Sequence, residues 1–165
     1  ARTGDRPERV LEKGSPAAWS PDGKAFFAVV SKKESDYQAV ENWKVSADGG
    51  DHSVLALPDA DVVEDWSPDG QWLAVMSRKD GQLYVVKPDG SGRRRLTDTD
   101  TNASGNDHPR FSPDSRRMVY HRTLYVGEDG ASESHFSLRT IHIDGTGDRE
   151  ILGEKKVGLL SRIRG

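Results

Sequence analysis

Histidines and carboxylates are the side chains of this chain that could do chemistry, and the histidines gather in its second half. Four of the five lie there: His108, His121, His135 and His142. An imidazole beside a carboxylate moves protons near neutral pH, and closely spaced imidazoles hold divalent metals. No two of these histidines have the close spacing of a metal-ligand pair. We therefore expect no bound metal and no cofactor, and we interpret these histidines as packed or surface residues.

The most densely polar segment is residues 106–109, where Asn106, Asp107 and His108 precede a proline. An amide, a carboxylate and an imidazole side by side can bind a ligand at the mouth of a cavity. The alternative is structural, because Asp and Asn beside Pro commonly hydrogen-bond the backbone where a strand begins. The sequence leaves both interpretations open.

Composition argues against several classes of protein. The chain has no cysteine, so it can form neither a disulfide nor a thiolate metal site. It has no Gly-x-Ser-x-Gly sequence, the motif of α/β-hydrolase peptidases. A net charge of -3 argues against nucleic acid and anionic membranes as partners. No apolar run approaches the roughly 20 residues of a membrane span, and the one dense basic run, Arg93 to Arg95, is expected on a solvated outer strand.

A repeat shows which elements must position these residues. An aromatic residue followed by Ser-Pro-Asp occurs three times, beginning at Trp19, Trp66 and Phe111. The copies are 47 and 45 residues apart (66 minus 19, 111 minus 66), which is the length of one propeller blade. Pro and Asp favour a tight turn, which a glycine closes in two of the copies. Ser115 replaces that glycine in the third copy, so this turn is expected to be slightly strained or of another type.

A second motif repeats in phase with the first. Asp-Gly turns at Asp48, Asp89 and Asp144 separate strand-like runs, as in β-hairpins. Together the two motifs predict an all-β propeller with three four-stranded antiparallel blades. The expected strands are 16–19, 24–31, 39–46 and 52–57 in blade one, 62–66, 72–77, 82–87 and 93–97 in blade two, and 108–111, 116–122, 137–143 and 148–152 in blade three, with a long loop over residues 123–136.

The whole chain is expected to form a single domain over residues 1–165. Its predicted parts are an outer strand at 3–13, blade one at 14–57, blade two at 58–97, blade three at 106–152 and a tail at 153–165. The first part echoes the sequence of residues 146–155, which include the outermost strand of blade three. We therefore interpret it as the outermost strand of a blade whose other strands are missing.

The motifs resemble the TolB-like β-propeller repeat, a relative of the tryptophan-aspartate repeats. The resemblance rests on aromatic-Ser-Pro-Asp-Gly, a strand ending in Asp-Gly-Ser-Gly, and Arg-Arg-Leu-Thr, and it covers roughly residues 3–155. It implies that ligands meet one rim, which is formed by the loops that enter the inner strands and by the loops that join the second and third strands of each blade. It also suggests a periplasmic or secreted bacterial protein. Such repeats occur in adaptor proteins, in serine peptidases and in polysaccharide-degrading enzymes, so the resemblance implies fold more firmly than function.

Three blades do not close a ring, because propellers have about 4 to 8. An open array would leave apolar blade faces in water, which is costly. The four tryptophans, Trp19, Trp43, Trp66 and Trp72, are spread over the first two blades. A second copy of the chain would complete a six-bladed ring, and so would missing blades of a longer protein. We expect self-association into a closed ring, with the fragment as the alternative.

The residue before each repeated aromatic is Ala18, Asp65 or Arg110. It alternates in direction with the aromatic, so it should face the channel or the neighbouring blade. Asp65 and Arg110 could pair there. The candidate ligand-binding residues of the rim and channel are Asp65, Asn106, Asp107, His108, Arg110 and His135.

Two functions follow from these residues. The first is a non-catalytic binding or scaffolding module that presents the rim and channel to a protein segment or a small ligand. The alternative is a carbohydrate-active enzyme, a polysaccharide lyase or hydrolase. It would use His108 or His135 with Asp107 or Asp65 as acid and base, with or without a metal.

Overall fold

The computed structural model describes residues 14–32, 36–99, 104–126 and 133–153. These residues form three four-stranded antiparallel sheets. The predicted all-β fold of four-stranded blades is confirmed. In the described ranges no helix is long and apolar enough to cross a membrane.

Each sheet takes its four strands in chain order, so every connection within a blade joins neighbouring strands. Blade one contains β1 (Ser15–Trp19), β2 (Ala25–Ser31), β3 (Val40–Ser46) and β4 (His52–Leu55). Blade two contains β5 (Asp61–Trp66), β6 (Leu73–Ser77), β7 (Gln82–Val86) and β8 (Arg94–Arg95). Blade three contains β9 (Ser104–Phe111), β10 (Arg117–Val126), β11 (Glu133–His142) and β12 (Arg149–Gly153).

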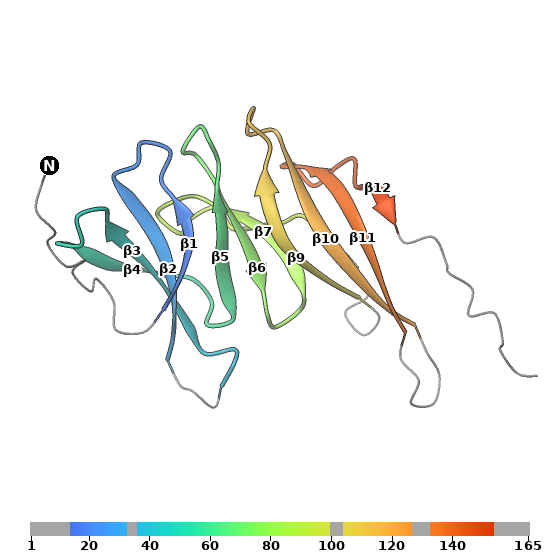
Figure 1. The fold of residues 1–165 in the computed structure, drawn as a ribbon, viewed down its shortest axis with the longest axis horizontal. Coiled ribbons are helices and arrows are strands. Elements are labelled where there is room, and N and C mark those ends of the chain that lie inside the picture. The colour runs from blue at the N-terminus through green and yellow to red at the C-terminus, as the bar shows by residue number, and fades with distance from the viewer. Residues whose placement is uncertain (1–13, 33–35, 100–103, 127–132, 154–165) are drawn as a thin grey trace, which may run out of the picture.

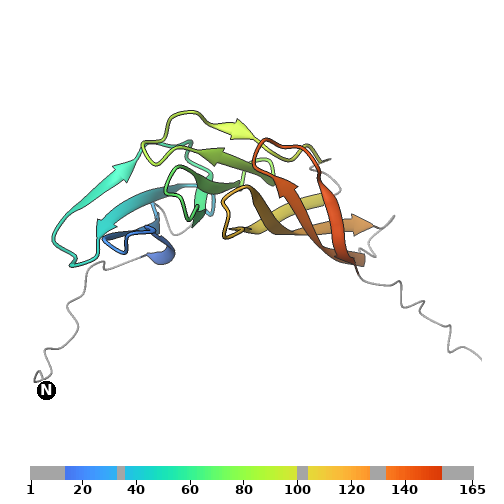
Figure 2. The ribbon, with the colours of Figure 1, turned by 90° about the horizontal axis from the view of Figure 1, so that it is seen from above.

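The first strands of the three blades lie next to one another. Figure 1 shows β1, β5 and β9 side by side and pointing in the same direction. Figure 2 shows the sheets fanned into an arc, with β1 on its concave side and β8 on its convex side. The arc is the geometry of adjacent propeller blades, so β1, β5 and β9 are the inner strands that position groups toward the axis.

Two apolar clusters join the blades. Between blades one and two, the rings of Phe27 and Trp66 lie 5.2 Å apart by their centroids. The rest of this cluster is Ala18, Leu55, Val63, Leu73, Val75, Tyr84 and Val86. Between blades two and three the buried cluster is Ala74, Leu83, Val85, Leu96, Met118, Tyr120 and Ile141. Burial of this apolar surface, at about 25 cal/mol per Å², is the main force that holds the inner strands in place.

The Ser-Pro-Asp turns have the same hydrogen bonds in each blade. In blade two, Ser67 Oγ donates to Asp69 Oδ1 at 2.6 Å, and the Gly70 amide donates to the Ser67 carbonyl at 2.8 Å. In blade three the Ser115 amide makes the equivalent bond at 2.9 Å, and Ser115 has a positive φ of 59°. Of the two alternatives from the sequence, the strained turn of the same type is therefore the correct one.

The third blade differs from the prediction in two places. Residues 123–126 and 133–136 continue β10 and β11 as paired strands, so the expected loop over 123–136 is wrong for those residues. Residues 104–107 belong to β9, which begins before the predicted start at 108. The cause is a longer hairpin ladder in blade three, in which Leu124 pairs with His135 on one side and Ser104 on the other. The predicted outer strand at 3–13 and residues 154–165 of the tail lie outside the described residues.

Candidate functional site

All three inner strands carry a β-bulge just before the repeated aromatic. The extra residue is Ala17 in β1 and Glu64 in β5, and the pair His108 and Pro109 forms the bulge of β9. A bulge breaks the strand pairing and turns its side chain away from the regular alternation. In blades two and three it therefore brings polar side chains out of the sheets and close to one another.

We call these side chains the bulge cluster: Glu64, Asp107, His108, Arg110 and His121. Asp107 Oδ1 lies 3.1 Å from His121 Nδ1 and 3.7 Å from His108 Nδ1. Arg110 Nη1 donates to the Glu64 carbonyl oxygen at 2.6 Å and lies 3.7 Å from Glu64 Oε2. The cluster therefore joins the inner strands of two blades with groups of both charges.

His108 is the most unusual member of the bulge cluster. Its φ of 52° is in the left-handed region, which a non-glycine residue enters only at a cost in energy. Its side chain is nevertheless 77% exposed, so packing of the ring does not compensate for that cost.

Glu64 is the member whose ionisation is most affected by its surroundings. Burial raises the pKa of its carboxyl above the usual value, and the nearby charge of Asp107 adds to the shift. His108 and Arg110 oppose this but do not reverse it. Such a carboxyl holds a proton to higher pH than an exposed glutamate, which suits either a hydrogen bond to a ligand or proton transfer.

Asp65 and Arg110 do not form the ion pair that the sequence suggested. Asp65 Oδ2 accepts a hydrogen bond from the Phe111 amide at 2.7 Å, and Arg110 turns instead to Glu64. The reason is the bulge at Glu64, which brings the Glu64 carbonyl into reach of the guanidinium. Asp65 thus joins β5 to β9 through the backbone.

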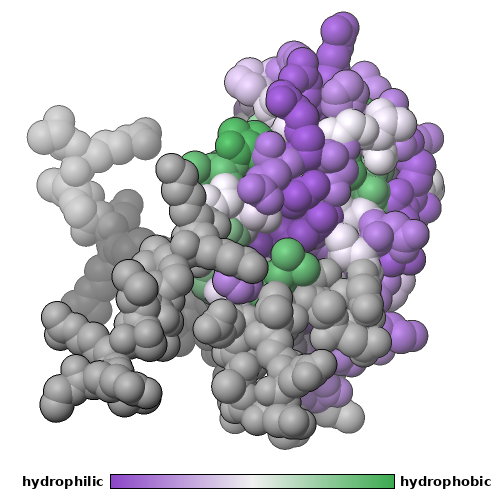
Figure 3. All heavy atoms as spheres, turned by 90° about the vertical axis from the view of Figure 1, so that its right-hand side faces the viewer, coloured by the Kyte–Doolittle hydropathy of each residue, from purple (hydrophilic) through white to green (hydrophobic). Residues whose placement is uncertain are grey.

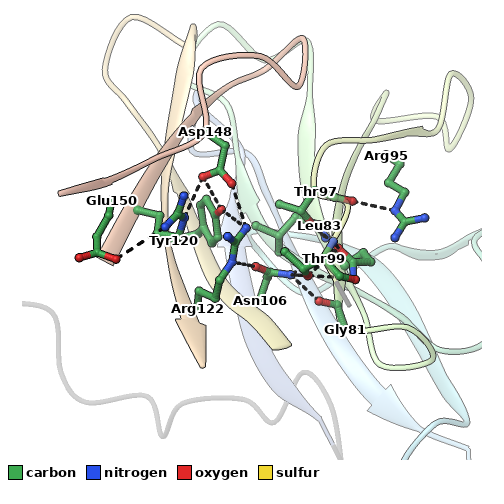
Figure 4. A network of polar contacts seen from close by, with 12 residues as sticks. Gly81, Leu83, Arg95, Thr97, Thr99, Asn106, Tyr120, Arg122, Asp148 and Glu150 are labelled. Carbon is green, nitrogen blue, oxygen red and sulfur yellow. Dashed lines mark hydrogen bonds and ion pairs between the residues drawn. The ribbon is translucent and has the colours of Figure 1, made fainter. Parts of the chain in front are cut away.

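Asn106 is 1% exposed and lies between blades two and three, where Figure 4 shows it at the centre of a polar network. Its Nδ2 donates to the Gly81 carbonyl and to Thr99 Oγ1, each at 2.9 Å, and its Oδ1 accepts from Arg122 Nε at 2.9 Å. The amide is thus occupied by bonds within the protein. Asn106 positions the neighbouring Asp107 on β9.

The network continues into blade three through Asp148 (Figure 4). Asp148 accepts hydrogen bonds from Tyr120 at 2.7 Å, from Arg122 at 2.9 Å and from Arg139 at 2.9 Å. Burial alone would raise the pKa of Asp148, but the hydrogen bonds from Arg139 and Tyr120 and the two positive charges hold it below its usual value. This fixes the outer part of blade three relative to β10.

His135 lies in β11 opposite Leu124, outside the bulge cluster. The sequence predicted His135 in a rim loop, but the structure places it in the long β10–β11 hairpin. The next residue, Phe136, stacks on His121 with ring centroids 5.1 Å apart. In the part of the chain that the structure describes, no three metal-ligating side chains gather as an ion would need.

A hollow of about 630 Å³ opens between blades one and two on the predicted rim. Four aspartates line it: Asp36, Asp59, Asp61 and Asp80. Asp61 is paired with Arg93, whose Nε and Nη2 donate to its two carboxylate oxygens at 2.7 and 3.0 Å. Arg93 is exposed, as predicted for the basic run, but this pair holds it in place, and its guanidinium carbon lies 3.4 Å from the centroid of the Tyr84 ring.

Comparison with known proteins identifies the fold. The sequence matches no protein-family model. It is 32% identical to an uncharacterized protein of Agrobacterium fabrum over 124 residues, which are 72% of this chain and 40% of that protein. It is 38% identical to an uncharacterized peptidase of Bacillus subtilis over 66 residues, which are 38% of this chain and 10% of that protein.

Solved structures agree with these relatives. A protein from Agrobacterium tumefaciens assigned as TolB superposes with a TM-score of 0.69 at 24% identity, covering 87% of this chain and 51% of its own. TolB from Acinetobacter baumannii gives a TM-score of 0.61 at 18% identity, with 85% and 32% covered. The chain therefore has a β-propeller fold like that of TolB. An oligogalacturonate lyase from Vibrio parahaemolyticus also superposes, with a TM-score of 0.62 at 10% identity and coverage of 84% and 39%.

This TolB-like array spans about half the length, or less, of the proteins it matches. The matched proteins include TolB, a lyase and a peptidase, so the fold does not separate binding from catalysis. The argument for a function must therefore come from the residues of the bulge cluster.

Two members of the bulge cluster, Glu64 and His121, were missed from the sequence of this TolB-like array. Glu64 stands two residues before its repeated aromatic, where the other blades have Ala17 and Pro109, so a charged residue there was a usable signal. His121 had no such signal, because only the β9–β10 register places it opposite Asp107.

Proposed function

We propose that this TolB-like array is a binding module, and that its bulge cluster receives an extended protein segment. The observation that carries the proposal is His108, held in a left-handed conformation with its side chain exposed beside Asp107. Strained backbone that packing does not explain is concentrated at binding and catalytic sites.

The chemistry of the bulge cluster suits a peptide. Arg110 and His108 are exposed donors for a backbone carbonyl or a carboxylate, and Glu64 and Asp107 are acceptors for backbone or terminal N–H groups. An extended segment offers both kinds of group in alternation along its length. A ligand of one charge would instead meet a group of the same charge within a few ångströms.

The test is an array of random octapeptides incubated with the wild-type chain and with a His108→Ala, Arg110→Ala variant. We expect the variant to lose the peptides that the wild type binds. The matched control is Lys87→Ala with Arg116→Ala, which removes two exposed cations from turns and should leave the bound set unchanged. Equal binding by all three proteins would show that peptides bind elsewhere.

The second candidate is a carbohydrate-active enzyme. It is supported by the contact of His121 with Asp107 at 3.1 Å, by the raised pKa of Glu64, and by the similarity of fold to an oligogalacturonate lyase. Incubation with oligogalacturonate, followed by ultraviolet absorbance of unsaturated products, tests this candidate. Activity that Glu64→Gln and His121→Ala both abolish would favour the enzyme over the binding module.

A further inference from the structure

The two end blades expose surfaces that equivalent residues bury in the middle of the array. Trp66, the repeated aromatic of blade two, is 9% exposed, because it packs on Phe27 of the preceding blade. Trp19 occupies the equivalent position in blade one and is 61% exposed. Among the described residues, no blade covers Trp19 as blade one covers Trp66.

At the opposite end of the array, blade three carries a surface that matches the one on which Trp66 sits. Around Trp66, blade one contributes Ser20, Pro21, Ala25 and Lys44 to one hollow. The spacing of 92 residues between Trp19 and Phe111 (111 minus 19) relates the first three of these to residues of blade three.

These three equivalents, Ser112, Pro113 and Arg117, line a hollow of about 580 Å³ on the free face of blade three. Val119, the equivalent of Phe27, and Thr140 also line it. Thr140 pairs with Val119 just as Lys44 pairs with Phe27, so it holds the equivalent place. Val119 and Thr140 are smaller than the residues they replace. The hollow therefore has the place that a repeated aromatic of a following blade would occupy, and the described residues contain no such blade.

The hydrogen bond from the Val63 amide to Asn42 has no counterpart on either end face. Between blades one and two, Asn42 Oδ1 accepts the Val63 amide at 2.8 Å. On the free face of blade three the equivalent residue is Leu138, opposite His121 as Asn42 is opposite Val29. On β1 the residue equivalent to Val63 is Pro16, which has no N–H group. In contact between the two end faces, the apolar Leu138 would thus lie against Pro16, which has no N–H group that needs an acceptor.

Both end faces carry exposed apolar side chains besides Trp19. These are Val54 on blade one and Phe136 and Leu138 on blade three. Figure 3 shows the blade-three end of the molecule, where hydrophobic patches lie among hydrophilic side chains. Such surfaces are costly to leave in water and typically mark an interface.

We propose that two copies of this chain close one ring, in which the hollow of blade three in each copy takes Trp19 of the other. The two contacts are identical and related by a two-fold axis, so the assembly closes without leaving a free face. It has six blades, within the range of about 4 to 8 known for propellers. The occupant is a second copy because its blade three presents the matching hollow, the small Val119 and Thr140, and Leu138 opposite Pro16.

Light scattering measures the mass of the 165-residue chain in solution. We expect twice the chain mass of 18.2 kDa at micromolar concentration. Trp19→Ala should raise the dissociation constant of the dimer at least about 100-fold, because both contacts lose a central aromatic. Val119→Arg, which fills the hollow from the other side, should have the same effect.

The matched control is Tyr37→Ala. Tyr37 is also an exposed aromatic, but it lies on the rim, where it stacks on Arg78, so its loss should leave the mass unchanged. Far-ultraviolet circular dichroism checks that each variant is folded, and Val119→Arg replaces Trp19→Ala should the latter unfold.

A folded wild-type monomer overturns the proposal and leaves further blades of a longer chain as the occupant. A dimer that persists in both variants overturns the assigned contact. Peptide binding at the bulge cluster is a separate measurement, so the two proposals can fail independently.

Discussion

Asn42 is the residue whose replacement should most clearly reveal how the blades are joined. It is 2% exposed, its Nδ2 donates to the Asp61 carbonyl at 2.8 Å, and its Oδ1 accepts the Val63 amide at 2.8 Å. Asn42→Leu keeps a side chain of similar size but leaves two backbone groups of β5 without partners. The variant thus removes both of these side-chain hydrogen bonds and leaves the backbone of β3 unchanged.

The size of the effect follows from the two bonds. Each buried group left without a partner costs about 1–3 kcal/mol, and the added apolar burial recovers about 1 kcal/mol. We expect a loss of about 3 kcal/mol in the free energy of unfolding. That is a large part of the about 5–15 kcal/mol that typically stabilises a folded domain.

The assay is urea unfolding followed by tryptophan fluorescence, since Trp66 lies in the cluster that Asn42 adjoins. With a slope of about 2 kcal/mol per molar urea, the midpoint should fall by about 1.5 M. Gln38→Leu, which alters an exposed amide nearby, is the control and should change stability by less than about 0.5 kcal/mol. A midpoint for Asn42→Leu within about 0.3 M of the wild type would refute the reasoning, because it would mean that water or backbone movement satisfies β5.

Three further predictions concern single residues. Ser115→Ala should destabilise by about 1 kcal/mol more than Ser115→Gly in the same urea assay, because both lose the bond from the Asp69 amide to Ser115 Oγ at 3.0 Å but only alanine keeps the strained φ of 59°. Asp148→Asn should lower the melting temperature at neutral pH. The folded pKa of Asp148 lies below its ordinary value, so the stability that it contributes is present above about pH 4 and is lost as the pH falls through the folded pKa. The wild type and Asp148→Asn should therefore converge in acid, and a constant difference from about pH 7 to about pH 2 would contradict this. Glu64→Gln should show the opposite trend: burial raises the folded pKa of Glu64, so ionisation costs stability above that pKa, and the variant should gain stability at pH 7 and match the wild type near pH 3. Unfolding midpoints at the two pH values measure this, and a gain that is equal at both would disprove it.

The sequence by itself determined the repeat and therefore the blades. Turn residues act locally: Ser-Pro-Asp closes its bend through bonds within a few residues, so Trp19, Trp66 and Phe111 could be aligned without knowledge of any distant contact. The same locality explains why strand positions near these turns were predicted well. Positions far from a turn, such as the start of β9 at Ser104, were not.

Only the tertiary structure decided which polar groups meet. One extra residue in β5 and in β9 shifts the register, and that shift sends Arg110 to Glu64, leaves Asp65 with the Phe111 amide and places His121 beside Asp107. A bulge has no unique sequence pattern, because its stability depends on both strands and on the neighbouring blade. The exposure of Trp19 has the same origin: its sequence motif matches that of Trp66, and only the presence or absence of a packed neighbour separates the two.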